Sequence, residues 1–374
     1  MNKAYYIGIM SGTSVDAIDV AIVDFNSGIQ LVAKHSQNIP PNIKKDILAL
    51  CLPGENEINR MGELDNALAI QFANAVLTAL EKNNLNSSQI AAIGSHGQTI
   101  RHMPDVAYPF TMQISNPALI TELTDITTIA DFRRADMAAG GQGAPLAPAF
   151  HAAIFTENQT NPVVLNLGGQ ANISILNNTG QHSVTGFDTG PGNALLNEWI
   201  SLHKNKEYDE DGKWSASAEI NEDLLNTMLS DDYFAEAPPK STGREHFNLD
   251  WLNKQLDGLS STVEANVVQS TLCELTARTV ADAIKNYAPD CKEVLVCGGG
   301  VHNKDLMMRL QRLSGLKTRS TADYGVDPDF MEAMAFAWLA KQAMQGVPAN
   351  AIEVTGAKHP VILGAIYPRS PKGT

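Results

Sequence analysis

The stretch VVLNLGGQANISIL, residues 163–176, contains the pattern that decides the fold. Its first five residues form the apolar run of a buried strand, a Gly-Gly turn follows, and the last five alternate between polar and apolar as a second strand does. A further strand then leads to Asp188. The pattern predicts three consecutive strands with a glycine turn after the first.

The next segment, VTGFDTGPGN at residues 184–193, predicts a strand that ends at Asp188, a tight turn, and a helix that begins at Asn193. A carboxylate at a strand end beside a Gly-Pro-Gly turn is held rigidly and can take a proton from a reacting hydroxyl or water. Ordinary turns use the same residue types, because Asp hydrogen-bonds nearby backbone readily. Asp188 is therefore a candidate catalytic base, with turn organisation as the alternative.

The same order of elements occurs twice in the chain. A strand, a small polar or glycine turn, two more strands, a long helix and another strand are predicted in each half. In the first half they lie at residues 5–10, 11–14, 17–25, 29–39, 57–82 and 91–95; in the second, the first strand lies at 163–167, the long helix at 263–287 and the last strand at 294–297. The repeat predicts two similar α/β lobes, residues 1–160 and 161–374, with a ligand-binding cleft between them.

Two segments lie outside this repeat. Residues 126–136 look like a strand that ends in charges, and a glycine-rich stretch at 139–145 follows. Residues 203–244 are polar with weaker periodicity, so we expect a partly helical insertion in the second lobe that can act as a lid.

Composition limits the possible classes of protein. The chain has 374 residues, of which 44% are hydrophobic and 18% charged, enough for a large core. Its net charge of −14 argues against a nucleic-acid surface, and no apolar run is long enough for a membrane span or a signal peptide. The four cysteines form no CxxC pair. We expect a cytoplasmic protein with reduced core cysteines and neither nucleic-acid nor membrane partners.

Three turns that directly follow apolar strands contain glycine: Ser11–Ser14, Gly168–Gly169 and Gly298–Gly300. Glycine lets backbone amides approach phosphate oxygens, and hydroxyl side chains add donors. One such turn is usually only a turn, but three at strand ends of a duplicated fold favour a nucleotide. The chain contains no Walker A or Rossmann glycine pattern of the required spacing.

These segments resemble the ATPase core shared by actin, Hsp70 and sugar kinases, which consists of two ribonuclease H-like lobes. The more specific resemblance is to the anhydro-N-acetylmuramic acid kinase family. It rests on seven segments that run from residue 8 to residue 340: GIMSGTSVDAIDVA, GSHGQT, DFRRADMAAGGQGAPL, NLGGQANIS, GFDTGPGN, CGGGVHN and EAMAFAWLA.

The resemblance implies an ATP-dependent enzyme of cell-wall sugar recycling that uses Mg²⁺ and forms a homodimer. It would hydrolyse the 1,6-anhydro ring of anhydro-N-acetylmuramic acid while phosphorylating O6, giving N-acetylmuramic acid 6-phosphate and ADP. It assigns the ATP phosphates to Gly12, Thr13, Ser14, Val15, Asp16, Ala17, Ile18, Asp19, Gly168 and Gly169, and the adenosine to Gly298, Gly299 and Gly300.

Under this resemblance Asp188 would be the base. The anhydro bridge leaves no free O6 hydroxyl to attack phosphorus, so a water must add at C1 as the C1–O6 bond opens and O6 meets the γ-phosphate. Asp188 would deprotonate this water, which links glycosidic cleavage to phosphoryl transfer. Two positions depart from the wider superfamily, which usually has Asp where this chain has Met10 and Asn166. We therefore expect Mg-ATP to be held chiefly through water and phosphates, with Asp188 nearby, and we assign no metal ligand.

The muramic acid carries a carboxylate, an N-acetyl group and hydroxyls, so its pocket needs both donors and acceptors. The candidates are His96, Gln98, Arg133, as a clamp for the lactyl carboxylate, and Glu332, as a contact to a sugar hydroxyl. Three of them have an ordinary alternative role. Arg133 could form a surface ion pair with Asp131 or Asp136, His96 could be a structural histidine, and Glu332 could only complement a helix dipole.

Other classes of protein stay open at this point. A nucleotide-driven chaperone or filament protein shares the two lobes but responds to peptides or polymerises. A nucleotide-independent glycosidase would use two carboxylates, such as Asp188 and Glu332, at a separation of roughly 5 to 9.5 Å, and would leave the three glycine turns unexplained. The nearest alternative is a relative that acts on another anhydro or amino sugar.

Overall fold

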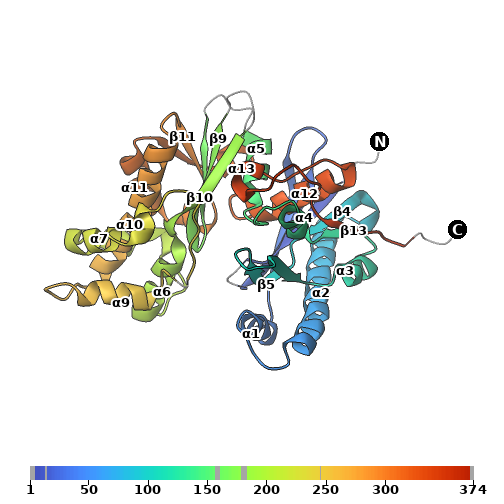
Figure 1. The fold of residues 1–374 in the computed structure, drawn as a ribbon, viewed down its shortest axis with the longest axis horizontal. Coiled ribbons are helices and arrows are strands. Elements are labelled where there is room, and N and C mark those ends of the chain that lie inside the picture. The colour runs from blue at the N-terminus through green and yellow to red at the C-terminus, as the bar shows by residue number, and fades with distance from the viewer. Residues whose placement is uncertain (1–4, 13–14, 156–160, 178–182, 245, 371–374) are drawn as a thin grey trace. The chain divides into compact units, whose positions relative to one another are not determined.

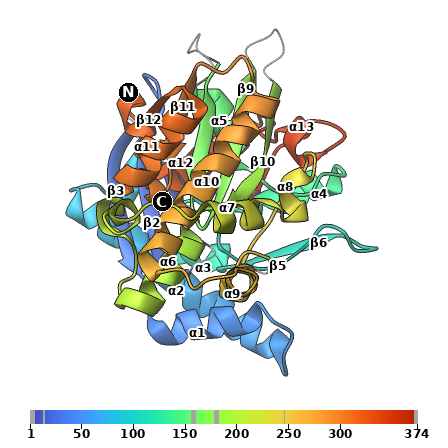
Figure 2. The same cartoon turned by 90° about the vertical axis from the view of Figure 1, so that its left-hand side faces the viewer.

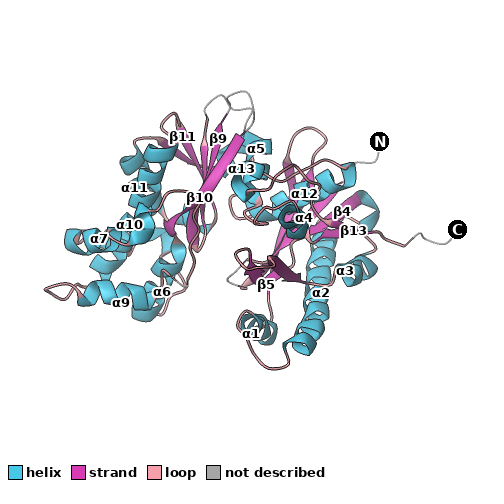
Figure 3. Cartoon of the chain, in the orientation of Figure 1, coloured by secondary structure: helices cyan, strands magenta, loops and turns pink. Residues whose placement is uncertain are grey.

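The computed structural model describes residues 5–12, 15–155, 161–177, 183–244 and 246–370. Contacts divide the chain into two compact units, one formed by residues 1–150 with 330–374 and the other by residues 151–329. Each unit taken alone has a main sheet flanked by helices (Figure 3). No helix in these described ranges is long and apolar enough to cross a membrane.

The main sheet of the first unit has the strand order β13-β7-β4-β1-β2-β3. β1, β2 and β3 are successive antiparallel neighbours, whereas β4 is parallel to β1 and β7 is parallel to β4. The strands of this unit are β1 (Tyr5–Met10), β2 (Ala17–Asp24), β3 (Gln30–Asn38), β4 (Ile90–Ser95), β7 (Thr128–Ala130) and β13 (Ala365–Tyr367), with β5 (Gln98–Met103) and β6 (Phe110–Ile114) as a separate hairpin. Its helices are α1 (Pro41–Leu50), α2 (Glu57–Lys82), α3 (Pro117–Thr124), α4 (Phe132–Ala138), α12 (Met331–Gln345) and α13 (Ile352–Thr355).

The two faces of this sheet are covered by different helices because successive strand residues point to opposite sides. Ile7 and Ile9 pack in one cluster with the apolar side of α2. Gly8 faces α12, and a Cβ atom there would lie 1.7 Å from the carbonyl oxygen of Ala333. Glycine is therefore required for α12 to lie directly on the sheet, where Figure 1 shows it beside β4.

The main sheet of the second unit has the order β10-β9-β8-β11-β12, with β8, β9 and β10 antiparallel and β11 and β12 parallel additions. α10 crosses this sheet and is buried on nearly all sides, with α11 beside it (Figure 2). The strands are β8 (Val163–Leu167), β9 (Gln170–Asn177), β10 (Ser183–Pro191), β11 (Glu293–Cys297) and β12 (Lys317–Ser320). The α-helices are α6 (Asn193–Lys204), α7 (Glu222–Leu229), α8 (Asp232–Ala235), α9 (Leu249–Asp257), α10 (Ala265–Tyr287) and α11 (Lys304–Ser314), and the 3₁₀ turns are η2 (Glu210–Gly212), η3 (Ser215–Ser217), η4 (Gly299–His302) and η5 (Thr321–Tyr324).

The strand orders confirm the duplicated α/β fold. In both units a three-stranded antiparallel meander continues through its first strand into parallel neighbours, which is the ribonuclease H-like arrangement expected from the sequence. Helix α5 (Ala147–Phe155) connects the units along the chain. The cleft between the lobes stays a prediction.

Three details differ from the sequence expectation. Residues 330–374 group with the first unit rather than with residues 161–329, because α12 packs on β1 and β4 and β13 pairs with β7. The charged end of the 126–136 segment forms the start of helix α4, not a strand. Cys51 is exposed, whereas the other three cysteines are buried, and all four are reduced. The 203–244 segment is partly helical as expected, and its role as a lid stays a prediction.

Candidate active site

Asp188 lies inside β10 rather than at its end, which corrects the sequence expectation. The register of β10 on β9 shifts between Asp188 and Gly190, so the strand bulges immediately after the carboxylate. Asp188 pairs across the sheet with Asn172, Asn172 with Asn166, and Asn166 with Cys297, the residue before the Gly298 turn. Cross-strand partners share a face, and neighbouring strands lie about 4.8 Å apart, so this row places Asp188 roughly 15 Å from Cys297.

A segment from the expected insertion fixes Asp188. The backbone N–H of Thr242 donates to Asp188 Oδ2 at 3.0 Å, and Asp188 N donates to the carbonyl of Lys240 at 3.2 Å. The hydroxyl of Tyr233 donates to the Asp188 carbonyl at 2.7 Å, and burial followed by the charge of Asp188 raises the pKa of Tyr233. The carboxylate therefore contacts a segment more than fifty residues away from its own turn. The alternative in which Asp188 only organises its turn does not require this contact.

The Gly168–Gly169 turn is held by the start of α6. The backbone amides of Asn193 and Ala194 donate to the carbonyls of Gly168 and Gly169 at 2.8 and 3.1 Å. A Cβ atom on Gly192 would lie 2.6 Å from the Gly168 carbonyl oxygen, so this close approach requires glycine. The turn and the helix end form one rigid corner beside the row that contains Asp188.

The glycines of the three predicted turns fall into two kinds. Gly298 has φ +80° and its Cβ would lie 2.5 Å from Asn166, so packing and backbone explain it. By contrast, a Cβ on Gly12 or Gly299 would meet no atom within 4 Å, and those on Gly168 and Gly169 would come no closer than 3.6 and 3.7 Å. None of these four has a positive φ. Neither packing nor conformation requires glycine there, which supports close approach of a ligand.

The third glycine of the Gly298–Gly300 turn is also structural, because its Cβ would lie 2.5 Å from Leu167 Cβ. Beside this turn lies a cavity of about 310 Å³, a volume suited to part of a small ligand. Gly299 forms one side of it, and the start of α6 and the η2 region form others. It is lined by Asn193, Leu196, Asn197, Tyr208, Asp209, Asp211, Gly299, His302 and Asn303.

Most of these lining residues were missed by sequence reasoning. Asn193 and Asn303 directly follow glycine-containing segments, and this position was the available clue. The sequence indicated the acidic residues at 209–211 only as part of a polar insertion. Their place in the cavity was not predictable, because their contact with α11 depends on the fold.

In the first unit, the predicted phosphate turn has a strained residue. Val15 is 1% exposed and has φ +55°, a backbone conformation that is costly for a β-branched side chain and is found mainly at functional sites. Its N–H donates to the carbonyl of Gly12, and Asp16 forms an ion pair with Lys44. Thr13 and Ser14 lie outside the described residues.

The remaining residues of this predicted segment belong to a strand. Ala17, Ile18 and Asp19 begin β2, and the side chain of Ile18 is fully buried in the core. Asp19 pairs across the sheet with Met10, the position at which the wider superfamily usually has Asp. The neighbouring strand therefore offers a carboxylate beside that position, and carboxylate oxygen is a ligand that suits Mg²⁺.

Buried polar atoms without protein partners gather around the same turn. Among the described residues, Ser11 Oγ, Ser95 Oγ and Gln98 Oε1 are buried and make no hydrogen bond. Ser95 pairs with Ile9 in the sheet, and Gln98 Nε2 lies 3.4 Å from the Gly12 carbonyl. Leaving such a group unsatisfied costs about 1–3 kcal/mol, so this concentration marks a place where a ligand or water completes the bonding.

His96 and Arg133 form a hydrogen-bonded pair in the first unit. Arg133 Nη2 lies 2.8 Å from His96 Nε2, and Arg133 Nη1 donates to the Gly143 carbonyl at 2.9 Å. Burial, followed by the charge of Arg133, holds the pKa of His96 well below its ordinary value, so His96 is neutral and accepts from the guanidinium. Phe336 of α12 packs against the imidazole with ring centroids 4.8 Å apart.

The arginine is not in the surface ion pair offered as its alternative. Asp131 pairs with Arg134, and Asp136 accepts hydrogen bonds from Gly143, Asn350 and Thr355. Burial lowers the pKa of Arg133 to about 10, and the charge of Glu332 acts in the opposite direction. A half-buried guanidinium that is hydrogen-bonded to neutral groups keeps its positive charge available for an anion.

Glu332 lies in the first turn of α12, where the sequence places it. Desolvation by the surrounding protein is the main cause that raises the pKa of Glu332. The charge of Arg133 opposes this rise, and the charge of Asp19 adds to it. The side chain is nevertheless exposed, so solvent limits this rise. His96, Arg133 and Glu332 thus belong to one neighbourhood of the first unit, while Asp188 and the cavity belong to the second.

Comparisons with known proteins agree with the family suggested by the sequence. The family model for anhydro-N-acetylmuramic acid kinase matches residues 4–369. A protein of this name from Coxiella burnetii (strain Dugway 5J108-111) is 50% identical over 368 residues, which cover 98% of each chain. Another from Pseudomonas fluorescens (strain Pf0-1) is 50% identical over 366 residues, 98% of this chain and 99% of that one.

Among solved structures, component A of (R)-2-hydroxyglutaryl-CoA dehydratase from Acidaminococcus fermentans is 13% identical with a TM-score of 0.48, covering 89% of this chain and 96% of its own. The full-length family match and the two relatives decide the assignment. The chain therefore belongs to the anhydro-N-acetylmuramic acid kinase family and is an ATP-using sugar kinase.

Proposed function

We propose that this enzyme opens the 1,6-anhydro ring of anhydro-N-acetylmuramic acid with water and transfers the γ-phosphoryl group of ATP to O6. The products are N-acetylmuramic acid 6-phosphate and ADP. The observation that carries the proposal is the row Asp188–Asn172–Asn166–Cys297, which connects a fixed carboxylate with both glycine turns of the second unit.

The chemistry needs one base. As the C1–O6 bond breaks, O6 becomes the nucleophile for the γ-phosphorus and C1 takes the oxygen of a water molecule. Asp188 accepts a proton from that water, so its carboxylate must be ionised and held in place. The hydrogen bond from Thr242 N–H favours the ionised form and fixes its orientation.

We assign the nucleotide contacts of the second unit to the two turns and the cavity. Gly168 and Gly169 would face the phosphates, and the cavity beside Gly299 would take the adenosine. The open space at each of these three glycines supports the assignment. Gly298 and Gly300 would act through the shape of their turn, because both are close-packed.

The sugar contacts are proposed for the first unit. Arg133 would bind the lactyl carboxylate, with His96 and Gly143 holding its guanidinium in place. Gln98 Oε1, which is buried without a protein partner in the described structure, would accept from a ligand N–H or hydroxyl. Glu332 would accept from a sugar hydroxyl.

Mg²⁺ would neutralise the charge that develops on the phosphate oxygens. Mg²⁺ commonly keeps several waters and uses only one or two carboxylates, and Asp19 is a carboxylate of the right kind. The same proposal places the enzyme in cell-wall sugar recycling in the cytoplasm, as a homodimer; size-exclusion chromatography with light scattering tests the dimer.

Mass spectrometry in heavy-oxygen water tests the coupled reaction. With anhydro-N-acetylmuramic acid and ATP, we expect a product that has the label at C1 and the phosphate at O6, with one ADP formed for each sugar consumed. Free sugar formed without ATP consumption would support the glycosidase alternative. ATP turnover that does not depend on the sugar would contradict the proposal.

A further inference from the structure

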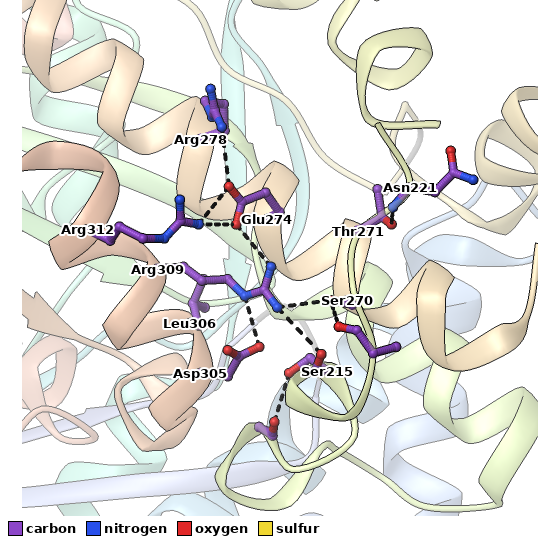
Figure 4. A network of polar contacts seen from close by, with 12 residues as sticks. Ser215, Asn221, Ser270, Thr271, Glu274, Arg278, Asp305, Leu306, Arg309 and Arg312 are labelled. Atoms are coloured by element: carbon purple, nitrogen blue, oxygen red, sulfur yellow. Dashed lines mark hydrogen bonds and ion pairs between the residues drawn. The ribbon is translucent and has the colours of Figure 1, made fainter. Parts of the chain in front are cut away.

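A buried group of charges lies between α10 and α11 in the second unit, away from Asp188 in the sequence and on different elements (Figure 4). Glu274 of α10 is only 1% exposed and receives hydrogen bonds from three arginines. Arg309 Nη1 lies 3.0 Å from it, Arg312 Nη2 2.8 Å and Arg278 Nη2 3.3 Å. Arg309 also donates from Nε to Asp305 at 3.0 Å. The catalytic proposal uses none of these side chains.

Arg309 differs from the other two arginines in what its remaining nitrogen touches. Its Nη2 donates to Ser270 Oγ at 2.9 Å and lies 3.5 Å from the carbonyl oxygen of Ser215. Ser270 Oγ in turn donates to the Ala218 carbonyl at 2.8 Å. Figure 4 shows the guanidinium between Glu274, Asp305 and these serines. Arg309 therefore connects both helices to the 215–218 backbone.

That backbone continues into a wall of the cavity. Asp209 accepts hydrogen bonds from the amides of Trp214 and Ser215, both at 2.8 Å, and so closes the 209–215 segment into a loop. Asp211 forms an ion pair with Lys304 at 3.1 Å. Asp209 and Asp211 both line the cavity.

The loop also approaches the first residues of α11 very closely. Gly212 has φ +68°, and a Cβ there would lie 2.1 Å from Asn303 Oδ1. Asn303 lines the cavity and accepts from Leu306 N to begin α11. The 209–215 loop is thus contacted by Arg309 at its end, at Ser215, and approached by Asn303 in its middle, at Gly212.

We propose that Arg309 is a positioning residue for nucleotide binding. Held by Glu274 and Asp305, its planar guanidinium fixes the 209–215 loop against α11 and so sets the width of the cavity. This inference rests on the proposed placement of the adenosine in that cavity. The five donors of arginine in a fixed fork suit this role, and lysine cannot reproduce the three directions in which Arg309 donates.

Arg309→Lys keeps the positive charge and removes the planar guanidinium that donates in three directions. We expect it to raise the KM for ATP and the Kd for ADP roughly tenfold, since small displacements of a binding wall have large effects on affinity. The KM for the sugar should change less than twofold. Ser270→Ala, which deletes one hydroxyl, should raise the nucleotide constants in the same direction and provides the test if Arg309→Lys does not fold.

Arg312→Lys is the matched control. Arg312 contacts the same Glu274 from the same helix but is 60% exposed and has no described contact with the 215–218 backbone. It should leave both nucleotide constants within twofold. Equal effects of Arg309→Lys and Arg312→Lys, or a lower melting temperature with unchanged nucleotide constants, would overturn the positioning role.

Gly299→Val separates this inference from the proposed site. Its new side chain enters the cavity and meets no atom within 4 Å at Cβ, so the fold should persist. A higher Kd for ADP in Gly299→Val with no change in Arg309→Lys and Ser270→Ala would overturn only the positioning role. An unchanged Kd in Gly299→Val would overturn the cavity as the adenosine site and, with it, the inference.

Discussion

Replacement of Asp188 by Asn removes the proposed base while keeping the size of the side chain. The amide oxygen of Asn can still accept the N–H of Thr242, which lies 3.0 Å from Asp188 Oδ2. A charge-assisted hydrogen bond becomes a neutral one, which costs about 1 kcal/mol of folding free energy. Loss of a general base lowers kcat by roughly 10² to 10⁴, equivalent to about 2.7–5.4 kcal/mol in the activation barrier. The loss of rate should therefore far exceed the loss of stability.

Three measurements on Asp188→Asn separate these terms: ADP release with saturating sugar, thermal melting, and the Kd for ADP. We expect a kcat at least a hundredfold lower, a melting temperature within a few degrees of wild type, and an ADP affinity within threefold. Asp290→Asn, an exposed carboxylate of the same unit, should leave all three unchanged. A kcat of Asp188→Asn within threefold of wild type would refute its role as the base.

Three further predictions concern the sugar, the metal and the acid side of the pH range. Arg133→Lys cannot reach both His96 and Gly143, so the KM for the sugar should rise at least tenfold with little change for ATP; 1,6-anhydro-N-acetylglucosamine, which lacks the lactyl carboxylate, should show no such rise. Chelation with EDTA should stop turnover and added Mg²⁺ should restore it, whereas full activity in EDTA would contradict the proposed use of Mg-ATP. Burial lowers the pKa of His151 to about 3, so the stability gained from keeping this imidazole neutral is complete above pH 6.5 and is lost as the pH falls toward 3. At pH 5 the loss should be about 2 kcal/mol in the free energy of unfolding. Urea unfolding at pH 7 and pH 5 should show that His151→Asn lacks this loss, and equal pH dependence in wild type and variant would contradict the role of His151.

The sequence predicted the regular elements best where periodicity was long. The helix expected at residues 57–82 is α2 with the same bounds, because apolar residues recur along one side over its whole length. The strand-turn-strand order of both halves was also readable, since apolar runs, glycine turns and alternation differ locally. The family motifs added the candidate residues but not the contacts of their side chains.

Tertiary packing decided the features that the sequence did not show. α12 is buried around most of its surface, so its apolar pattern does not indicate which sheet it covers. The residues that let α12 lie on the first sheet are far away in the sequence. They are Gly8 and Gly94, where a Cβ would lie 1.7 and 2.0 Å from α12 carbonyl oxygens. The cavity proposed for the adenosine was hidden for the same reason, because its walls come from segments more than a hundred residues apart.

The contacts of Asp136 explain why the C-terminal segment belongs to the proposed sugar site. Asp136 is fully buried and accepts from Gly143 N at 2.8 Å, Asn350 Nδ2 at 2.9 Å and Thr355 Oγ1 at 2.8 Å. The carbonyl of Gly143 in turn accepts from Arg133, so the guanidinium depends on residues more than two hundred positions later. A buried carboxylate is tolerated only when such donors surround it, and removal of one exposes the full cost of its desolvation. The return of the chain to the first unit therefore adds the edge strand β13 to the sheet and supplies donors to Asp136, which in turn holds the Gly143 backbone that contacts Arg133.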